Sequence, residues 1–127
     1  MSAMDKSCRD AWEATEFVAI VTQGEDGPHM VGNWGDYVRK LGIRGDTVLL
    51  PAGRYHQTEA NLARDNRVTL LIASRDVPGP HGPGQGYAMT GTAEVVTEGP
   101  LVDEVKEQFA WARGALVIEI AKATAQL

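Results

Sequence analysis

The stretch Ala52-Gly-Arg-Tyr-His-Gln-Thr-Glu-Ala-Asn-Leu-Ala-Arg-Asp-Asn-Arg67 organises this chain. It joins two apolar runs, Val48–Pro51 and Val68–Ile72, that are typical of strands. Between them lie a glycine-containing loop and then Thr58, which heads a segment rich in helix formers, about residues 58 to 65. Strand, loop and helix N-terminus in this order can bind an anion, because the first N–H groups of a helix lack internal partners and the helix dipole favours negative charge there. We therefore predict a phosphate cradle in this stretch.

The composition is that of an ordinary globular chain, with 127 residues, 43% of them hydrophobic and 23% charged. This length supports one domain over residues 1–127. The formal net charge of −5 argues against nucleic acid or anionic membrane as partners, since both require a basic surface. The single cysteine, Cys8, allows no internal disulfide and fits a reducing compartment. Because the sequence shows neither a signal peptide nor an apolar run near ~20 residues, we expect a cytoplasmic protein without a membrane span.

Apolar periodicity predicts a chain dominated by strands. An amphipathic helix is expected over residues 4–15, with Trp12 on its buried stripe. The expected strands cover residues 17–23, 29–34, 47–51, 67–74, 87–97 and 115–121, with a bend at Gly91. A further helix is expected over 101–111, irregular to extended chain over 35–41, a long loop over 76–86 and a short tail over 122–127. This pattern, with a hairpin first, favours an antiparallel barrel over a βαβ sheet.

Two local groups of residues allow both a structural and a ligand-binding interpretation. A threonine at a helix start normally caps it, and this is the plainer interpretation of Thr58. Gly53 would also permit close backbone approach of a ligand, and Arg54 offers a bidentate phosphate partner or is a solvated loop residue. Trp34 and Tyr37 at a strand end are either core residues or a platform for a flat ring.

The sequence gives no sign of a metal site or of a catalytic residue. The three histidines, His29, His56 and His81, are far apart and have no second ligand at helical spacing. No paired carboxylates and no Ser/His/Asp or Cys/His arrangement is present at a defensible spacing. Cys8 lies on the apolar face of the first helix and is expected to be a small core residue.

Several segments in a fixed order give the chain a strong resemblance to a known family. They are Thr22–His29, Trp34 with Tyr37, His56–Asn61 with Ala63–Asp65, Gly82–Gly84 and Trp111–Arg113. Over residues 17–127 the chain resembles the small FMN-binding proteins of sulfate-reducing anaerobes. These belong to the flavin-binding split-barrel superfamily, together with the pyridoxamine-phosphate oxidases.

The resemblance implies a mainly β fold: a six-stranded antiparallel Greek-key split barrel with short flanking helices. It also implies a homodimer that binds one FMN per subunit near the interface. The phosphate would lie from Gly53 to Thr58 and the isoalloxazine along residues 32–34, while Trp111 and Leu127 would reach across from the partner subunit. The residues expected to bind the cofactor are Gly32, Asn33, Trp34, Tyr37, Ala52, Gly53, Arg54, Gln57, Thr58, Gln85, Trp111 and Leu127.

Two positions depart from what the resemblance leads us to expect. Gln57 stands where a lysine is expected, and a charge-assisted hydrogen bond to phosphate contributes roughly 1.5–3 kcal/mol, or about tenfold to a hundredfold in affinity. We expect Arg54 to restore the positive charge. Gly32 stands where a polar side chain is expected, so one flavin hydrogen bond is expected to be missing or taken by water.

The expected function is electron transfer by a bound FMN to or from a redox protein partner. No side chain in the predicted site is an obvious proton donor for a substrate carbon, and we expect the chain to lack the basic C-terminal segment with which the oxidases hold their substrate. An NAD(P)H-linked flavin reductase or oxidoreductase on the same barrel is the alternative. A flavin-free barrel used in regulation or assembly is a third interpretation.

Overall fold

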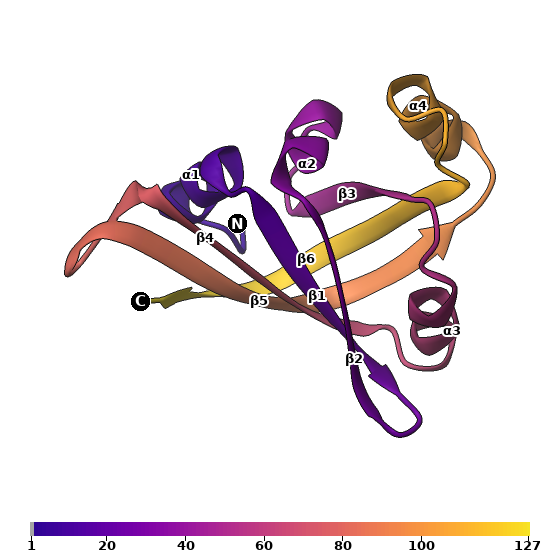
Figure 1. The fold of residues 1–127 in the computed structure, drawn as a ribbon, viewed down its shortest axis with the longest axis horizontal. Coiled ribbons are helices and arrows are strands. Elements are labelled where there is room, and N and C mark those ends of the chain that lie inside the picture. Colours follow the sequence, from indigo (N-terminus) through magenta and orange to yellow (C-terminus); the bar gives the residue numbers. More distant parts are fainter. Residues whose placement is uncertain (1) are drawn as a thin grey trace.

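The computed structural model describes residues 2–127, which form six strands and four short helices (Figure 1). In chain order they are α1 (Lys6–Ala14), β1 (Phe17–Gly24), β2 (Gly27–Trp34), α2 (Gly35–Leu41), β3 (Thr47–Ala52), α3 (His56–Arg64), β4 (Arg67–Gly79), β5 (Gly82–Val96), α4 (Pro100–Gln108) and β6 (Gly114–Gln126). All neighbouring strands pair antiparallel in the order β2-β1-β4-β5-β6-β3. The expected six-stranded antiparallel split barrel is therefore confirmed.

The sheet order leaves β2 and β3 as its two edge strands. The β4–β5 hairpin tip and the end of β6 lie together at the left of Figure 1, and α3 and α4 lie at the opposite end. The expected bend at Gly91 is confirmed as a break in register between β5 and β6. A Cβ atom at Gly91 would lie 1.9 Å from the Glu119 carbonyl oxygen, so only glycine allows this close approach of the two strands.

The core forms where alternating strand residues meet the apolar stripe of α1. In β1, Val18, Ile20 and Thr22 are buried and their neighbours are not, as expected for a strand with one covered face. The stripe of α1 contributes Cys8, Ala11 and Trp12, all fully buried, which confirms the amphipathic helix expected there. A second apolar cluster lies beneath α4 and joins it to α2 and β3.

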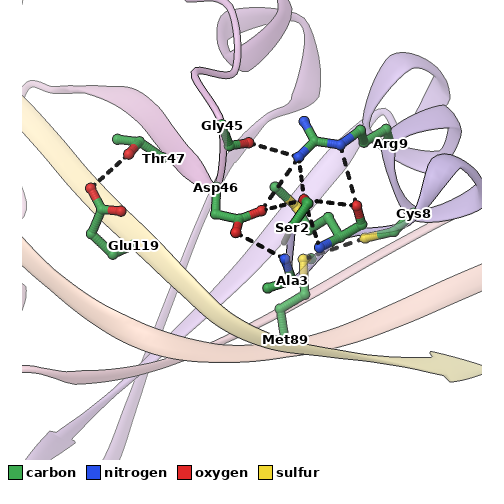
Figure 2. A network of polar contacts seen from close by, with 10 residues as sticks. Ser2, Ala3, Cys8, Arg9, Gly45, Asp46, Thr47, Met89 and Glu119 are labelled. Atoms are coloured by element: carbon green, nitrogen blue, oxygen red, sulfur yellow. Dashed lines mark hydrogen bonds and ion pairs between the residues drawn. The ribbon is translucent and has the colours of Figure 1, made fainter.

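A polar network fastens the N-terminal arm to the turn before β3 (Figure 2). The Asp46 carboxylate accepts hydrogen bonds from the Ser2 hydroxyl at 2.7 Å and from the Ala3 N–H at 2.9 Å. Arg9 donates to the same carboxylate at 3.3 Å and to the Gly45 carbonyl oxygen at 2.8 Å. These hydrogen bonds hold the pKa of Asp46 below its ordinary value, with the Ala3 N–H the largest cause. The arm is thereby tied to a turn about 40 residues away in sequence.

The expectation of irregular chain over residues 35–41 is wrong, because this segment forms α2. Gly35, Val38 and Leu41 are three residues apart and are buried on one face. Gly42 follows at φ 81° and donates its N–H to the Val38 carbonyl oxygen, which ends the helix. The glycine at the start of the segment obscured this helical spacing.

The long loop expected over 76–86 and the tail expected over 122–127 are also largely wrong. Most of the first segment belongs to the β4–β5 hairpin, where Pro78 faces Pro83 and Gly79 faces Gly82 around a two-residue turn. Antiparallel strands contain pairs without ladder hydrogen bonds, and such a pair tolerates two prolines because neither needs an N–H. Residues 122–126 continue β6 along β5, so only Leu127 lies beyond the strand.

Candidate functional site

A cleft of about 370 Å³ opens where the two edge strands approach each other. It is lined by residues of β2, the start of α2, the end of β3 and the loop after it, and the segment before β6: Gly32, Asn33, Trp34, Tyr37, Pro51, Gly53, Arg54, Tyr55 and Trp111. Seven of the twelve residues predicted to bind a cofactor are among these nine: Gly32, Asn33, Trp34, Tyr37, Gly53, Arg54 and Trp111. The fold therefore brings together residues that are up to 79 positions apart in sequence (32 to 111).

Hydrogen bonds from Asn33 and Tyr55 connect β2 to β3 and to the loop after it at the cleft. The Asn33 side-chain amide donates to the Pro51 carbonyl oxygen at 3.3 Å, and its oxygen accepts from the Trp34 N–H at 2.9 Å. The Tyr55 hydroxyl donates to the Gly32 carbonyl oxygen at 2.9 Å. Burial raises the pKa of Tyr55 to about 12, so this hydroxyl is a neutral donor at physiological pH. Asn33 therefore joins β2 to β3, and Tyr55 joins β2 to the segment that follows β3.

The helix predicted to begin at Thr58 begins at His56, and the expectation that Thr58 caps it is wrong. The N-cap is Tyr55, in the left-handed region at φ 64° and ψ 27°, and no side chain caps the helix. Thr58 is the third helical residue. Its hydroxyl is fully buried and has no hydrogen-bond partner within residues 2–127. A buried hydroxyl left without a partner is unfavourable, so this oxygen is suited to a ligand.

The backbone preceding Thr58 carries further unused donors. The first helical bond of α3 runs from the Glu59 N–H to the Tyr55 carbonyl oxygen at 2.8 Å. In the part of the chain that the structure describes, none of the N–H groups from Gly53 to Thr58 donates to a protein acceptor. A row of free N–H groups leading into a helix N-terminus is a concave donor set for an oxyanion. Together with the Thr58 hydroxyl it fits a phosphate group.

Arg113 holds this loop from the side of β6. Its backbone N–H donates to the Ala52 carbonyl oxygen at 2.9 Å. Its side chain donates to the Gly53 carbonyl oxygen at 3.1 Å and to the Arg54 carbonyl oxygen at 2.6 Å and 3.0 Å. The remaining guanidinium nitrogen pairs with Glu59 in the first turn of α3 at 2.8 Å. Arg113 and Tyr55 were both missed, although Arg113 closes the Trp111–Arg113 motif and Tyr55 lies inside the organising stretch.

Aromatic side chains form the other wall of the cleft. Trp34 and Trp111 are 48% and 56% exposed, so both are surface residues rather than core residues. The ring centroids of Tyr37 and Trp111 are 6.0 Å apart. A Cβ atom at Gly53 would lie 2.9 Å from the Trp111 ring, so glycine at this position makes room for the tryptophan. Trp111 lines the cleft of its own chain.

Gly32 makes room for another aromatic ring. A Cβ atom at this position would lie 1.9 Å from Cζ of Phe17, whose ring packs edge-on against Trp34 with centroids 5.8 Å apart. Glycine at this position therefore allows the close approach of the Phe17 ring. The space where a polar side chain was expected is filled by Phe17.

The five remaining predicted residues, one of which is the buried Thr58 described above, do not line the cleft. Ala52 is buried at the end of β3. The Gln57 amide donates to Asn61 at 2.8 Å and lines a separate hollow beside the β1–β2 turn. Gln85 and Leu127 line a third hollow of about 360 Å³ with the β4–β5 hairpin.

Within residues 2–127 no group of three or more His, Cys, Asp or Glu side chains is placed to hold a metal ion. None of the helices in that range has the length and apolarity needed to cross a membrane.

Comparison with known proteins gives matches over nearly the whole chain. The family profile described as pyridoxamine 5'-phosphate oxidase matches residues 4–126. The "FMN-binding protein" of Nitratidesulfovibrio vulgaris (strain DSM 19637 / Miyazaki F) is 47% identical over 106 residues, which cover 84% of each chain. Among solved structures, HupZ of Group A Streptococcus superposes with a TM-score of 0.77 at 16% identity, covering 96% of this chain and 93% of HupZ. An FMN-binding protein from Syntrophomonas wolfei superposes with a TM-score of 0.63 at 14% identity, covering 94% and 88%. The two superpositions support the fold.

Proposed function

The chain belongs to the pyridoxamine 5'-phosphate oxidase family, and from this premise we propose that its cleft binds FMN for electron transfer with a redox protein partner. The observation that carries the proposal is the donor set at residues 53–58, in which unused backbone N–H groups meet a buried, unpartnered Thr58 hydroxyl. A relative with 47% identity is named as an FMN-binding protein. The phosphate end of FMN is the chemical group that such donors fit.

The cleft would hold the ring of FMN, and the donor row of residues 53–58, which begins at the cleft, would hold its phosphate. The N–H groups and Thr58 would hold the phosphate, and the exposed Arg54 side chain, which lines the cleft and forms no ion pair with another described residue, would add positive charge. Trp34, Tyr37 and Trp111 would cover the isoalloxazine. When bound, FMN supplies one- and two-electron redox chemistry, and the protein orients it and limits its contact with water.

The residues of the cleft favour an electron carrier over a substrate-specific oxidase. The nine lining residues include no Asp, Glu, His, Cys or Lys. The Tyr55 hydroxyl, with a pKa of about 12, already donates to the Gly32 carbonyl oxygen. General acid–base catalysis requires a group whose pKa lies near the operating pH, and none of the lining side chains provides one. The cleft can orient a flavin, but it offers no group that would exchange a proton with a substrate carbon.

The test is to add FMN to the purified, flavin-free protein and then to add NADH, NADPH or dithionite without oxygen. We expect stoichiometric uptake of FMN, no bleaching by NADH or NADPH within minutes, and full reduction by dithionite. Rapid bleaching by NADH or NADPH alone would instead identify a flavin reductase. A protein that takes up no FMN would contradict the proposal and favour the flavin-free interpretation.

The homodimer is part of the same proposal. Cross-strand pairing places Phe17 opposite Trp34, Val21 opposite Met30 and Ala19 opposite Leu71, so four exposed apolar side chains share one face of β2, β1 and β4. An exposed apolar face of this kind is typical of an association surface. Gln85 and Leu127 line a separate hollow and do not reach the cleft of their own chain. They would therefore contact a flavin bound in the cleft of a partner subunit.

Sedimentation equilibrium tests the dimer. We expect a mass twice the chain mass of 13.7 kDa, and a Leu71→Glu variant that sediments as a monomer because it places a charge in the apolar face. Lys122→Glu, a change at an exposed polar position of β6, is the control and should leave the mass unchanged. A wild-type protein that is monomeric at micromolar concentration would exclude the dimer.

A further inference from the structure

Arg113 uses four nitrogens, one of the backbone and three of the side chain, for contacts with its own chain. Three of its donor groups serve the consecutive carbonyl oxygens of Ala52, Gly53 and Arg54. The fourth nitrogen pairs with Glu59. Its guanidinium charge is thereby turned toward the protein and is not free to meet a ligand directly.

The three carbonyl contacts fix the direction of the three N–H groups that follow. In a planar trans peptide the C=O and N–H bonds point in opposite directions. Since the carbonyls of residues 52–54 point at Arg113, the N–H groups of Gly53, Arg54 and Tyr55 point away from it. These three residues line the cleft and their N–H groups have no protein acceptor within residues 2–127. Arg113 therefore sets the orientation of half of the unused donors.

From this geometry we infer that Arg113 is a positioning residue that makes the site selective for the phosphorylated flavin without touching the phosphate. The inference rests on the proposed function, because it assigns the loop to the phosphate of FMN. Tyr55 supports it from the other side, since its hydroxyl fastens the loop to Gly32 and its left-handed backbone turns the chain into α3. The donor row is thus held in place before any ligand binds.

The test compares FMN with riboflavin, which has the same ring system without the phosphate. In Arg113→Ala the Gly53 and Arg54 carbonyls lose their side-chain donors, while the backbone N–H still donates to Ala52. We expect FMN affinity to fall about tenfold to a hundredfold while riboflavin affinity changes less than about threefold. Arg67→Ala is the matched control, because it removes the same charge from an exposed site on β4 whose partner is Asp65. It should leave both affinities unchanged.

Two conservative variants separate positioning from charge. Arg113→Lys keeps the charge, but a single ammonium group cannot replace the planar guanidinium, which contacts the Gly53 and Arg54 carbonyl oxygens and Glu59 together. The FMN affinity of this variant should therefore lie below that of the wild type. Glu59→Gln removes the ion pair but leaves the carbonyl contacts, so the ratio of FMN to riboflavin affinity should fall less than about threefold.

Distinct results would overturn the inference. They are equal losses of FMN and riboflavin affinity in Arg113→Ala, wild-type FMN affinity in Arg113→Lys, or a loss in Glu59→Gln as large as that in Arg113→Ala. A wild-type protein that takes up neither flavin would instead refute the proposed function itself. Urea unfolding of each variant, together with retained riboflavin affinity, shows that it is folded.

Discussion

Thr58 carries a hydroxyl that is enclosed by protein and has no protein partner. Thr58→Val keeps the shape and removes that hydroxyl. Since an unsatisfied buried group is unfavourable by roughly 1–3 kcal/mol, we expect the flavin-free protein to gain about 1 kcal/mol in free energy of unfolding and FMN affinity to fall about tenfold. Urea unfolding and FMN titration measure the two effects. Thr22→Val is the matched control: its hydroxyl accepts from Asn61 at 3.0 Å, so this variant should lose stability.

The effect of positive charge at positions 54 and 57 on FMN affinity can be measured by removing the charge of Arg54 and by adding one at Gln57. Arg54→Ala removes the free cation at the cleft, and we expect about a tenfold loss of FMN affinity. Gln57→Lys adds a cation in the first turn of α3 and replaces the amide that now bonds Asn61, and we expect it to tighten FMN binding. If the first change has no effect and the second does not tighten binding, Arg54 does not compensate for the absent lysine.

Gly32 and Phe17 form a complementary pair. In Gly32→Ala the new Cβ would lie 1.9 Å from the Phe17 ring, and overpacking of this kind is unfavourable by about 1–3 kcal/mol. Adding Phe17→Ala removes the obstructing ring, so the double variant should lose less stability than the sum of the two single changes. A double-mutant cycle by urea unfolding measures this coupling, and strict additivity would contradict it.

Residues of the site were predictable where residue type alone carries the chemistry. Trp34, Tyr37 and Gly53 were identified this way and Trp111 through the family resemblance, and all four line one cleft. Arg113 was not, because its role is set by three carbonyl groups, and any residue type supplies a carbonyl. Thr58 was misplaced as a cap because the left-handed conformation of Tyr55, which starts α3 earlier, is uncommon for a residue with a side chain.

The turn before β3 and the N-terminal arm form one structural element through Asp46. Asp46→Asn removes the charge that Ser2, Ala3 and Arg9 share, and we expect a lower Tm and faster proteolysis of the arm. Asp10→Asn is the control, since Asp10 pairs only with the exposed Lys6 on the same helix. Equal Tm values for wild type and Asp46→Asn would show that the network does not anchor the arm.

The sequence predicted the helices and strands whose apolar residues recur at a regular spacing. It did not predict those that contain glycine or proline at decisive positions. The period-2 burial of β1 and the apolar stripe of α1 are visible in the sequence. The β4–β5 hairpin contains Pro78 facing Pro83, a pairing that depends on register, and register depends on contacts distant in sequence. Helix α2 is seven residues long and opens with glycine, so packing against α1 and β3 sets its conformation more than local propensity.

At the scale of the whole molecule, two weakly acidic side chains, the buried Cys8 and the half-buried Tyr55, predict how stability depends on pH. Burial raises the pKa of Cys8 from 9.0 to about 11 and that of Tyr55 from 10.0 to about 12. The unfolded chain therefore releases these protons at lower pH than the folded protein does. The contribution of these two groups to the free energy of unfolding is fully present below pH 9 and is lost as the pH rises from 9 to 12.

Urea unfolding between pH 8 and 11 measures this loss. In the wild type we expect the free energy of unfolding to decrease by about 2–3 kcal/mol over this range from Cys8 alone, since each pKa unit corresponds to about 1.4 kcal/mol. Cys8→Ala should be less stable at pH 8, because it leaves space beside Met89, but its curve should be flatter. If the free energy of unfolding falls equally with pH in the wild type and in Cys8→Ala, Cys8 is not the cause of the loss.

The pairing of β3 with β6 determines when the site can form during synthesis. Ala52 pairs with Gly114, and Trp111 and Arg113 complete the cleft from the same late segment. A ribosome therefore makes Gly53–Thr58 about half a chain before the residues that orient them. The complete site therefore forms only after Trp111 and Arg113 have been made, and we expect FMN to bind the finished chain rather than the growing one.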